Sequence, residues 1–233
     1  MQTHFFKKFP FLRLSRLFFA LLTLPLFCAI FTLSGCKQAV DYLSYVSEFR
    51  NNIFLAETEE ISLRIYSVCK ETPYIADGIA NESSARTEVF LSATDGTQAY
   101  TLEMQVNGSS YGGELAYDNV KGEYFLSFSL DISPYKELPC TIIHGENQIQ
   151  LTAVSVLRDE ILAPKSILEN VRAYAPELFK EMTDKYGFKG EIYLRLLYED
   201  SPYYYVGVID RNKDIYAFLV NATNGKVLAR RNP

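Results

Sequence analysis

The sequence has no tryptophan and little histidine, methionine or cysteine: its 233 residues include two histidines, three methionines and four cysteines. Only one histidine, His144, lies beyond residue 35. A zinc or catalytic site built on two imidazoles is therefore excluded for that part of the chain. The sequence also contains no Cys-x-x-Cys pair, P-loop or Gly-x-Gly-x-x-Gly motif, so we expect neither a metal ion nor a cofactor.

Basic residues are also in the minority, with 23 Lys and Arg against 28 Asp and Glu and a net charge of −5. No positive stretch is available to face a phosphate backbone, so we expect no nucleic-acid partner. The chain is 48% hydrophobic and 14% aromatic. This composition is typical of a folded globular protein rather than a disordered one.

The N-terminal segment has the pattern of an export signal. Four basic residues and no acidic one precede an apolar run that extends from Leu17 to Leu33. The sequence Leu33-Ser34-Gly35-Cys36 that ends this run resembles the lipobox of bacterial lipoproteins. The resemblance implies that residues 1–35 are a signal peptide cleaved between Gly35 and Cys36, and that the Cys36 thiol carries diacylglycerol.

A diacylglyceryl group supplies the two acyl chains that stable membrane anchoring requires. We therefore expect an exported protein, lipid-anchored to a bacterial membrane. Removing four basic residues from 23 leaves 19 against 28 acidic ones, a net charge of −9 for the remaining chain. Residues 36–50 are expected to be the anchor and a tether, in which Tyr42, Tyr45 and Phe49 share one face of a short helix.

Residues 51–157 alternate between apolar and polar side chains with a period of two. Ile61, Leu63 and Ile65 form one such stripe, and turn dipeptides such as Asn107-Gly108 separate the stripes. This pattern predicts short antiparallel strands in a mainly β domain, and the strand count favours an immunoglobulin-like sandwich. The segment resembles no family known to us.

A different pattern begins after a short connection. Ser166 and Glu169 form a capping box that predicts the start of a helix, and apolar residues at helical spacing continue to Met182. Pro176 should kink or split this helix, and Gly187 should end it. Strands are expected over residues 192–196, 203–209, 215–220 and 226–228. The sequence therefore predicts a small α+β domain over residues 160–233.

The end of this domain carries a resemblance to a known family. An aromatic strand at residues 204–208 is followed by a polar turn and by the sequence Tyr216 to Leu228, which includes Asn221-Ala222-Thr223-Asn224-Gly225-Lys226-Val227-Leu228. This arrangement resembles the end of a PepSY domain, although Asn221 replaces the usual aspartate. The resemblance implies an exported, non-enzymatic module that binds or restrains peptidases, and it brings no catalytic residues.

Three motifs resemble functional sites only in part. Gly108-Ser109-Ser110-Tyr111-Gly112 matches a nucleophile elbow, but no helix is predicted after it, so we interpret it as a hairpin loop. Asp210-x-Asn212-x-Asp214 copies half of a calcium loop and lacks its glutamate, so we interpret it as a turn. Cys140 and His144 are predicted to be a buried thiol and an imidazole at a turn. Whether Cys140 pairs with Cys69 is left open, because pairing depends on geometry.

Tyrosines are the best candidates for binding residues. Exposed tyrosine combines a large apolar surface with a hydroxyl group, and it is common at protein and sugar contacts. We single out Tyr198, Tyr203, Tyr204, Tyr205 and, in a proline-led loop, Tyr74. The alternation of a strand would place about half of the C-terminal set in the core.

These observations favour a non-catalytic protein-interaction module at the membrane, with an envelope protein or peptidase as its partner. The alternative is a lipoprotein that binds a glycan or a small solute through tyrosines. A hydrolase that uses carboxylates or Ser110 is the third hypothesis, and the absence of a catalytic set argues against it.

Overall fold

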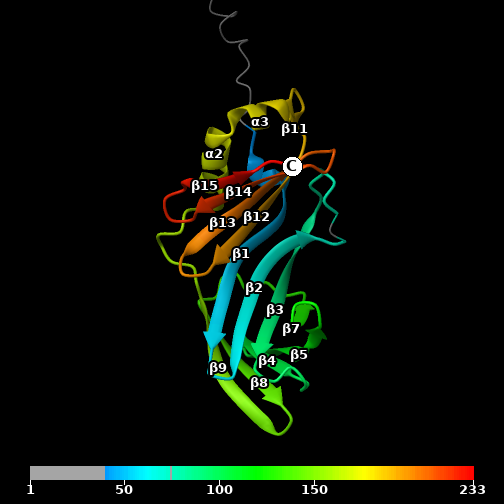
Figure 1. The fold of residues 1–233 in the computed structure, drawn as a ribbon, viewed down its shortest axis with the longest axis vertical. Coiled ribbons are helices and arrows are strands. Elements are labelled where there is room, and N and C mark those ends of the chain that lie inside the picture. Colours follow the sequence, from blue (N-terminus) through cyan, green and yellow to red (C-terminus); the bar gives the residue numbers. More distant parts are fainter. Residues whose placement is uncertain (1–39, 74) are drawn as a thin grey trace, which may run out of the picture. The chain divides into compact units, whose positions relative to one another are not determined.

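The computed structural model describes residues 40–73 and 75–233. The predicted signal peptide, its cleavage site at Gly35 and Cys36, and Tyr74 all lie outside the described residues. Residues Val40–Pro233 form one compact unit. The predicted mainly β character with antiparallel pairing is confirmed (Figure 1). None of the helices in the described ranges combines the length and the apolar character that a membrane crossing requires.

The first nine strands follow one another in a curled sheet of order β5-β4-β8-β9-β1-β2-β3-β7-β6. Their bounds are β1 (Val46–Glu57), β2 (Ile61–Glu71), β3 (Ser83–Ala93), β4 (Thr101–Val106), β5 (Ser109–Glu114), β6 (Ala116–Asp118), β7 (Glu123–Phe128), β8 (Glu137–His144) and β9 (Asn147–Ser155). The rings of Tyr111 on β5 and Phe128 on β7 stack 6.4 Å apart, so the strand at one end of this order approaches the strand next to its other end. The sheet is barrel-like, and an immunoglobulin-like sandwich is not confirmed.

Alternation explains why these strands form. On β2, Ile61, Leu63 and Ile65 are buried and the residues between them are half-buried. They belong to a hydrophobic cluster that also takes Leu102 and Met104 from β4. Side chains two residues apart point to the same side of a strand, so each strand supplies one apolar face to this core.

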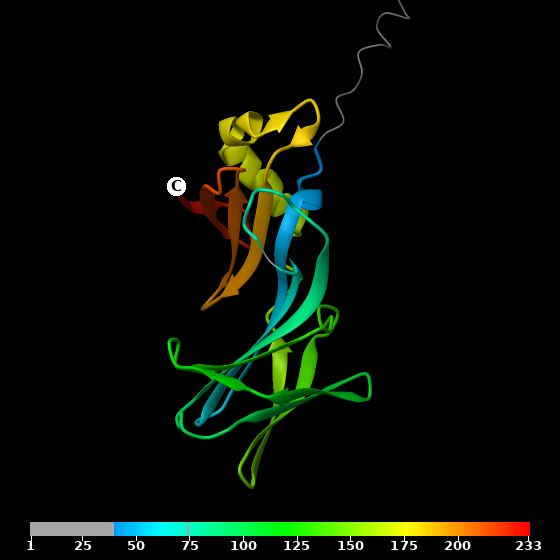
Figure 2. The same cartoon turned by 90° about the vertical axis from the view of Figure 1, so that its right-hand side faces the viewer.

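Four strands and two helices form the second part. The strands β12 (Glu191–Tyr198), β13 (Pro202–Ile209), β14 (Ile215–Asn221) and β15 (Val227–Arg231) are antiparallel neighbours in that order. Helices α2 (Pro164–Tyr174) and α3 (Pro176–Glu181) pack on one face of this group (Figure 2). Ile167, Val171 and Phe179 from the helices meet Val206 and Phe218 from the strands in a second hydrophobic cluster.

The helix boundaries differ from the prediction at both ends. Helix α2 begins at Pro164 after Ala163, which makes no side-chain capping bond, so the capping box predicted at Ser166 lies inside the helix. Proline is favoured in the first helical turn because its missing N–H would be unpaired there anyway. The split at Pro176 is confirmed. The helices end at Glu181, before the small hairpin β10 (Thr183–Asp184) and β11 (Gly187–Phe188), rather than at Gly187.

Residues 40–50, the described part of the segment expected to be anchor and tether, belong to the compact unit. Only Tyr42–Tyr45 form a short 3₁₀ helix, η1, and β1 begins directly afterwards at Val46. The prediction of a helix that includes Phe49 was wrong, because this part of β1 pairs in parallel with β12 and antiparallel with β2. Tertiary pairing overrides a short helical pattern.

Strand β1 joins the two parts of the molecule. Its first half, Val46 to Arg50, pairs with β12, whereas Phe54 and Leu55 pair with β9 along the same edge. The buried residues of the first cluster lie between Phe54 and Ala153, and most of those in the second lie after residue 155. One hydrogen-bonded sheet therefore contributes to both cores.

Candidate binding face

The four predicted tyrosines that lie in the described part of the chain differ in their exposure. Tyr204 is only 2% exposed and belongs to the core under the helices, where desolvation raises its pKa to about 12. Its neighbours Tyr203 and Tyr205 are half-buried, and the Tyr203 hydroxyl accepts a hydrogen bond from Ser201 at 2.7 Å. Tyr198 is exposed at the end of β12. A role for Tyr204 in surface binding therefore conflicts with its position.

The partial motifs have structural roles in the fold. Asn107 and Gly108 both have positive φ and form a two-residue turn, so Ser110 lies in the β4–β5 hairpin. Such a turn requires the left-handed conformation at both positions. The Asp210 carboxylate accepts hydrogen bonds from the backbone N–H groups of Asn212 and Asp214 at 2.8 and 3.0 Å. The stretch from Asp210 to Asp214 is a turn, as predicted. Of the predicted hairpin loop only Gly108 lies in the turn, because residues 109–112 pair with β4 as part of strand β5.

The two cysteines of the described residues are free thiols. Cys140 is buried, and desolvation raises its pKa to about 12, so it is not poised as a nucleophile. The His144 ring lies at the end of β8, with its Nδ1 3.1 Å from Oε1 of Gln98. The predicted pair of a buried thiol and an imidazole beside a turn is confirmed.

A row of cationic and aromatic side chains crosses four neighbouring strands. The guanidinium carbon of Arg50 on β1 lies 4.0 Å from the ring centroid of Tyr66 on β2. The Tyr66 ring is 5.2 Å from that of Phe90 on β3, which is 5.1 Å from that of Phe125 on β7. We call Arg50, Tyr66, Phe90 and Phe125 the arginine–aromatic row. All four side chains are half-buried, so each keeps part of its surface available for contact.

The row continues into the second part through Arg195 on β12. Its guanidinium carbon lies 4.8 Å from the ring centroid of Tyr193 and 5.8 Å from that of Tyr205. Its nitrogens bind both carboxylate oxygens of Glu48 on β1. Because Arg195 stands opposite Arg50 in the parallel register, cations and aromatic rings form a continuous band from β13 to β7.

Two further cations lie against the centre of the row. The Arg64 guanidinium carbon and the Lys121 Nζ are 6.0 and 5.7 Å from the Phe90 ring centroid. Arg64 also forms an ion pair with Glu123 at 2.6 Å. Cations at these distances are attracted to the face of an aromatic ring. The ring of Phe90 is therefore approached by two cations, Arg64 and Lys121.

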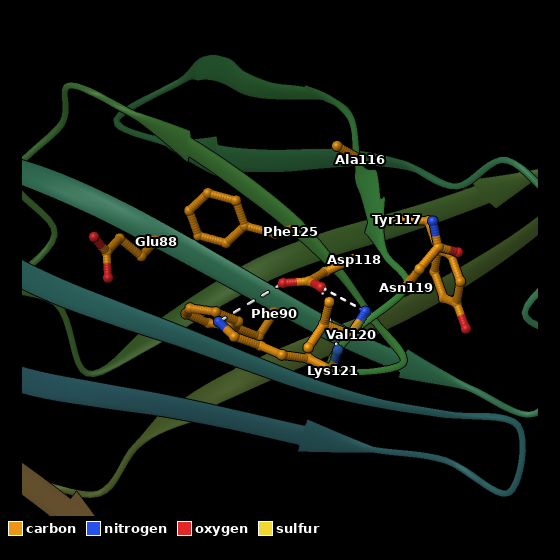
Figure 3. A pocket seen from close by; sticks show the side chains of 9 residues that line it. All are labelled: Glu88, Phe90, Ala116, Tyr117, Asp118, Asn119, Val120, Lys121 and Phe125. Atoms are coloured by element: carbon orange, nitrogen blue, oxygen red, sulfur yellow. Dashed lines mark hydrogen bonds and ion pairs between the residues drawn. The ribbon is translucent and has the colours of Figure 1, made fainter.

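An open hollow of about 690 Å³ lies at the β3–β7–β6 end of the row (Figure 3). Its lining comprises Glu88, Phe90, Ala116, Tyr117, Asp118, Asn119, Val120, Lys121 and Phe125. The Lys121 side chain reaches across Phe90 and its Nζ is 3.9 Å from the Asp118 carboxylate, whereas the Glu88 carboxylate forms an ion pair with Lys70. Val120 in the turn is 95% exposed. The hollow combines an aromatic floor with charged walls.

Arg50 and Arg86 stand on either side of Val68. Each is directly opposite Val68 in the strand register, from β1 and β3 respectively, and Val68 is only 2% exposed. In the described part of the chain, neither arginine has a carboxylate within 4.0 Å. The Nε of Arg50 is buried without a hydrogen-bond partner, and desolvation lowers the pKa of Arg50. Arg86 donates two hydrogen bonds to the Ser127 hydroxyl, at 3.2 and 3.4 Å.

A buried carboxyl group lies elsewhere, at the start of β12. Glu191 is fully buried, and neither its oxygens nor the buried Ser47 hydroxyl has a hydrogen-bond partner. Desolvation, with smaller contributions from Glu71 and Asp77, raises the pKa of Glu191 to about 7. Ser47 and the Gly78 N–H lie near enough to oppose this rise, but neither reaches hydrogen-bonding geometry. Within residues 40–73 and 75–233 no cluster of acidic, histidine or cysteine side chains is arranged to hold a metal ion.

Comparison of the chain with protein-family models and with curated proteins found no match. The assignment of the binding face therefore depends on the residues alone. The arginine–aromatic row was not predicted from the sequence, because its four side chains come from four strands that only the sheet register brings together. The sequence did contain one indication of this row. Arg64 and Tyr66 alternate with the buried residues of β2, and Arg86 and Phe90 alternate with those of β3, so cationic and aromatic side chains share the outer face of both strands.

Proposed function

We propose that this protein is a lipid-anchored module of the bacterial envelope that binds another protein without catalysing a reaction. The lipobox-like sequence that ends at Cys36 supports the anchor, because two acyl chains would hold the compact unit at a membrane surface. The unit begins at Val40, so few residues separate it from the proposed lipid. Its partners would then be proteins at the same membrane.

One observation carries the proposal of a protein partner, namely the continuous band of cations and aromatic rings from β13 to β7. Arginine and aromatic residues are enriched at the centres of protein interfaces, because they combine large contact areas with directional hydrogen bonds. The band crosses strands that belong to both hydrophobic cores. A partner that docks on it would therefore contact a rigid surface.

A glycan is the alternative ligand, and the aromatic floor of the hollow is the feature that favours it. Sugar rings bind aromatic side chains by stacking on an open ring face. Arg50 already covers the ring of Tyr66, and Arg64 and Lys121 approach that of Phe90. Protein side chains can contact the remaining edges and guanidinium groups, so we favour a protein.

The C-terminal part supports the same class of function. We propose that residues 160–233 are a PepSY-like domain and that the partner is a peptidase or another envelope protein. The support is the sequence from Tyr216 to Leu228, together with two helices that pack on four antiparallel strands. No comparable family is proposed for residues 51–157, whose strands curl into a barrel-like sheet.

Site-specific photo-crosslinking in bacteria tests this function. A photoreactive phenylalanine analogue would replace Phe125 in the row and, as a control, Val154 on β9, which is 41% exposed. We expect a defined protein adduct from position 125 and none from position 154. Equal adducts at both positions, or none at either, would contradict a protein-binding face. An adduct with polysaccharide alone would favour the glycan alternative.

A further inference from the structure

We propose that Arg50 and Arg86 form a receptor for carboxylate groups, and that the segment of the partner that docks on this face is acidic. This inference rests on the proposed function, because it names the chemistry of the partner at the same face. Three observations carry it: neither arginine has a carboxylate partner among the described residues, both are placed around Val68, and the band has an excess of positive charge.

The strand register places the two arginines close enough for one ligand to reach both. Arg50 on β1 and Arg86 on β3 each face Val68 on the intervening strand β2. Strands are spaced about 4.8 Å apart, so the two backbones are roughly 10 Å apart. Arginine side chains can cover most of that distance. A carboxylate above Val68 can thus accept hydrogen bonds from either guanidinium or from both.

The guanidinium of Arg50 has few hydrogen-bond partners in the fold, and an anion could supply more. Its Nε is buried without a partner, and its Nη1 makes only a long contact of 3.5 Å with the Leu196 carbonyl oxygen. Desolvation lowers the pKa of Arg50, and Arg195 lowers it further, whereas Tyr66, Glu48 and Glu88 oppose this shift without forming an ion pair with Arg50. A partly desolvated guanidinium without an ion-pair partner is costly. A carboxylate that meets the exposed part of Arg50 would supply the charge-assisted hydrogen bonds it lacks.

The band is positive although the chain is acidic, with a net charge of −5. Its cations are Arg50, Arg64, Lys70, Arg86, Lys121 and Arg195, and its carboxylates are Glu48, Glu88, Asp118 and Glu123. Each of these four carboxylates is paired with one of the cations. The excess positive charge is therefore Arg50 and Arg86. Such a local excess attracts a negative partner and repels a positive one.

An acidic peptide segment fits these groups better than a phospholipid headgroup does. The acidic chain as a whole is repelled by an anionic membrane surface, so a lipid would have to overcome that repulsion. The aromatic rings beside the arginines are spaced 5.2 and 5.1 Å apart and offer apolar contacts. A peptide presents carboxylates and apolar side chains together, whereas a headgroup presents only its charge to this face.

A random-peptide display library, applied to the protein from residue 37 onward, tests the inference. This protein contains the entire compact unit Val40–Pro233. We expect the selected peptides to be enriched in aspartate and glutamate. Arg50→Gln and Arg86→Gln should each weaken the binding of a selected peptide about tenfold, as expected for the loss of a charge-assisted hydrogen bond. Arg172→Gln, on the exposed side of α2, removes the same charge and should have no effect.

Several outcomes would overturn the inference. Selected peptides without acidic enrichment, no selection at all, or binding that is unchanged in both glutamine variants would each do so. Vesicles containing phosphatidylglycerol form a second arm, and binding to them that depends on both arginines would identify a headgroup as the ligand instead. Since Arg50 is half-buried, thermal unfolding must show that its variant is folded, and Arg86→Gln decides the matter if it is not. Protein crosslinking at position 125 that persists in both variants would contradict this inference and leave the proposed function intact.

Discussion

Arg195 and Glu48 form a two-point ion pair that joins strands 147 residues apart in the sequence, with Nε–Oε1 and Nη2–Oε2 distances of 2.7 and 2.6 Å. Both side chains are largely buried, with exposed fractions of 32% for Arg195 and 11% for Glu48. The pair lies where β1 and β12 run in parallel. It therefore links the two parts of the molecule at the position where they share one sheet.

Removing one partner of this pair should destabilise the fold. We expect Arg195→Met to reduce the free energy of unfolding by about 2 kcal/mol, because Glu48 would keep a charge without its partner in a largely buried position. Urea unfolding measures the change. Lys180→Met breaks the exposed pair with Glu177 on α3 and should change stability by less than about 0.5 kcal/mol. Equal effects of the two substitutions would show that the Arg195 pair contributes no more than a surface contact.

The stability contributed by Glu191 should depend on pH. Its pKa is about 7 in the folded protein and 4.5 when unperturbed. Between pH 4.5 and pH 7 the Glu191 carboxyl is ionised in the unfolded chain but still protonated in the folded protein. The stability that protonated Glu191 contributes is therefore fully present below pH 4.5, falls as the pH rises, and is lost above pH 7. Glu191→Gln removes the titration. As the pH rises from 5 to 8, we expect the free energy of unfolding of the variant, relative to that of the wild type, to increase by about 2 kcal/mol in urea unfolding.

A matched control separates Glu191 from the other carboxylates. Glu181→Gln alters an exposed residue at the end of α3 and should leave the pH profile of stability unchanged. If the profiles of Glu191→Gln and the wild type were parallel from pH 5 to pH 8, Glu191 would have an ordinary pKa in the folded state.

Tyr204 and Tyr198 should respond differently to truncation. Tyr204→Ala removes a buried aromatic ring from the core under the helices and is expected to cost about 3–5 kcal/mol of stability. Tyr198 is 39% exposed, so Tyr198→Ala should cost less than about 1 kcal/mol. Thermal and urea unfolding give both values. A small loss for Tyr204→Ala would mean that its ring does not fill the core.

The two thiols of the compact unit should differ in reactivity. Cys140 is 4% exposed with a pKa of about 12, whereas Cys69 is half-buried. Thiolate is the reactive form, so an aromatic disulfide reagent at pH 8 should modify Cys69 much faster than Cys140, and both equally after unfolding. Cys69→Ala should leave only the slow phase in the native protein. A fast phase in that variant would show that Cys140 is accessible.

The proposed anchor depends on one atom, the Cys36 sulfur. Cys36→Ser should prevent incorporation of a labelled fatty acid in bacteria and should move the protein from the membrane fraction to the soluble fraction. Cys69→Ser is the matched control, because it removes a thiol from β2 and should not change the location. Retention of Cys36→Ser in the membrane with its N-terminal segment uncleaved would indicate a different anchor.

Local patterns in the sequence predicted local structure well. The alternation of Ile61, Leu63 and Ile65 predicted a strand with one buried face, because side-chain direction follows directly from strand geometry. The Asn107-Gly108 turn and the helix break at Pro176 were predicted for similar reasons. Each depends on the φ angles that one or two residues can adopt. The helix predicted to include Phe49 was wrong, because the spacing of a few apolar residues is compatible with either a helix or a strand.

The sequence alone determined which residues could form strands, turns and helices, and that the described chain would be mainly β. Tertiary structure alone decided that β1 pairs with β12, that the sheet curls into a barrel-like form, and that Arg50 and Arg86 stand on either side of Val68. The reason is physical. Side-chain direction within a strand is a local property, whereas register between distant strands depends on how the whole sheet twists and buries its apolar faces.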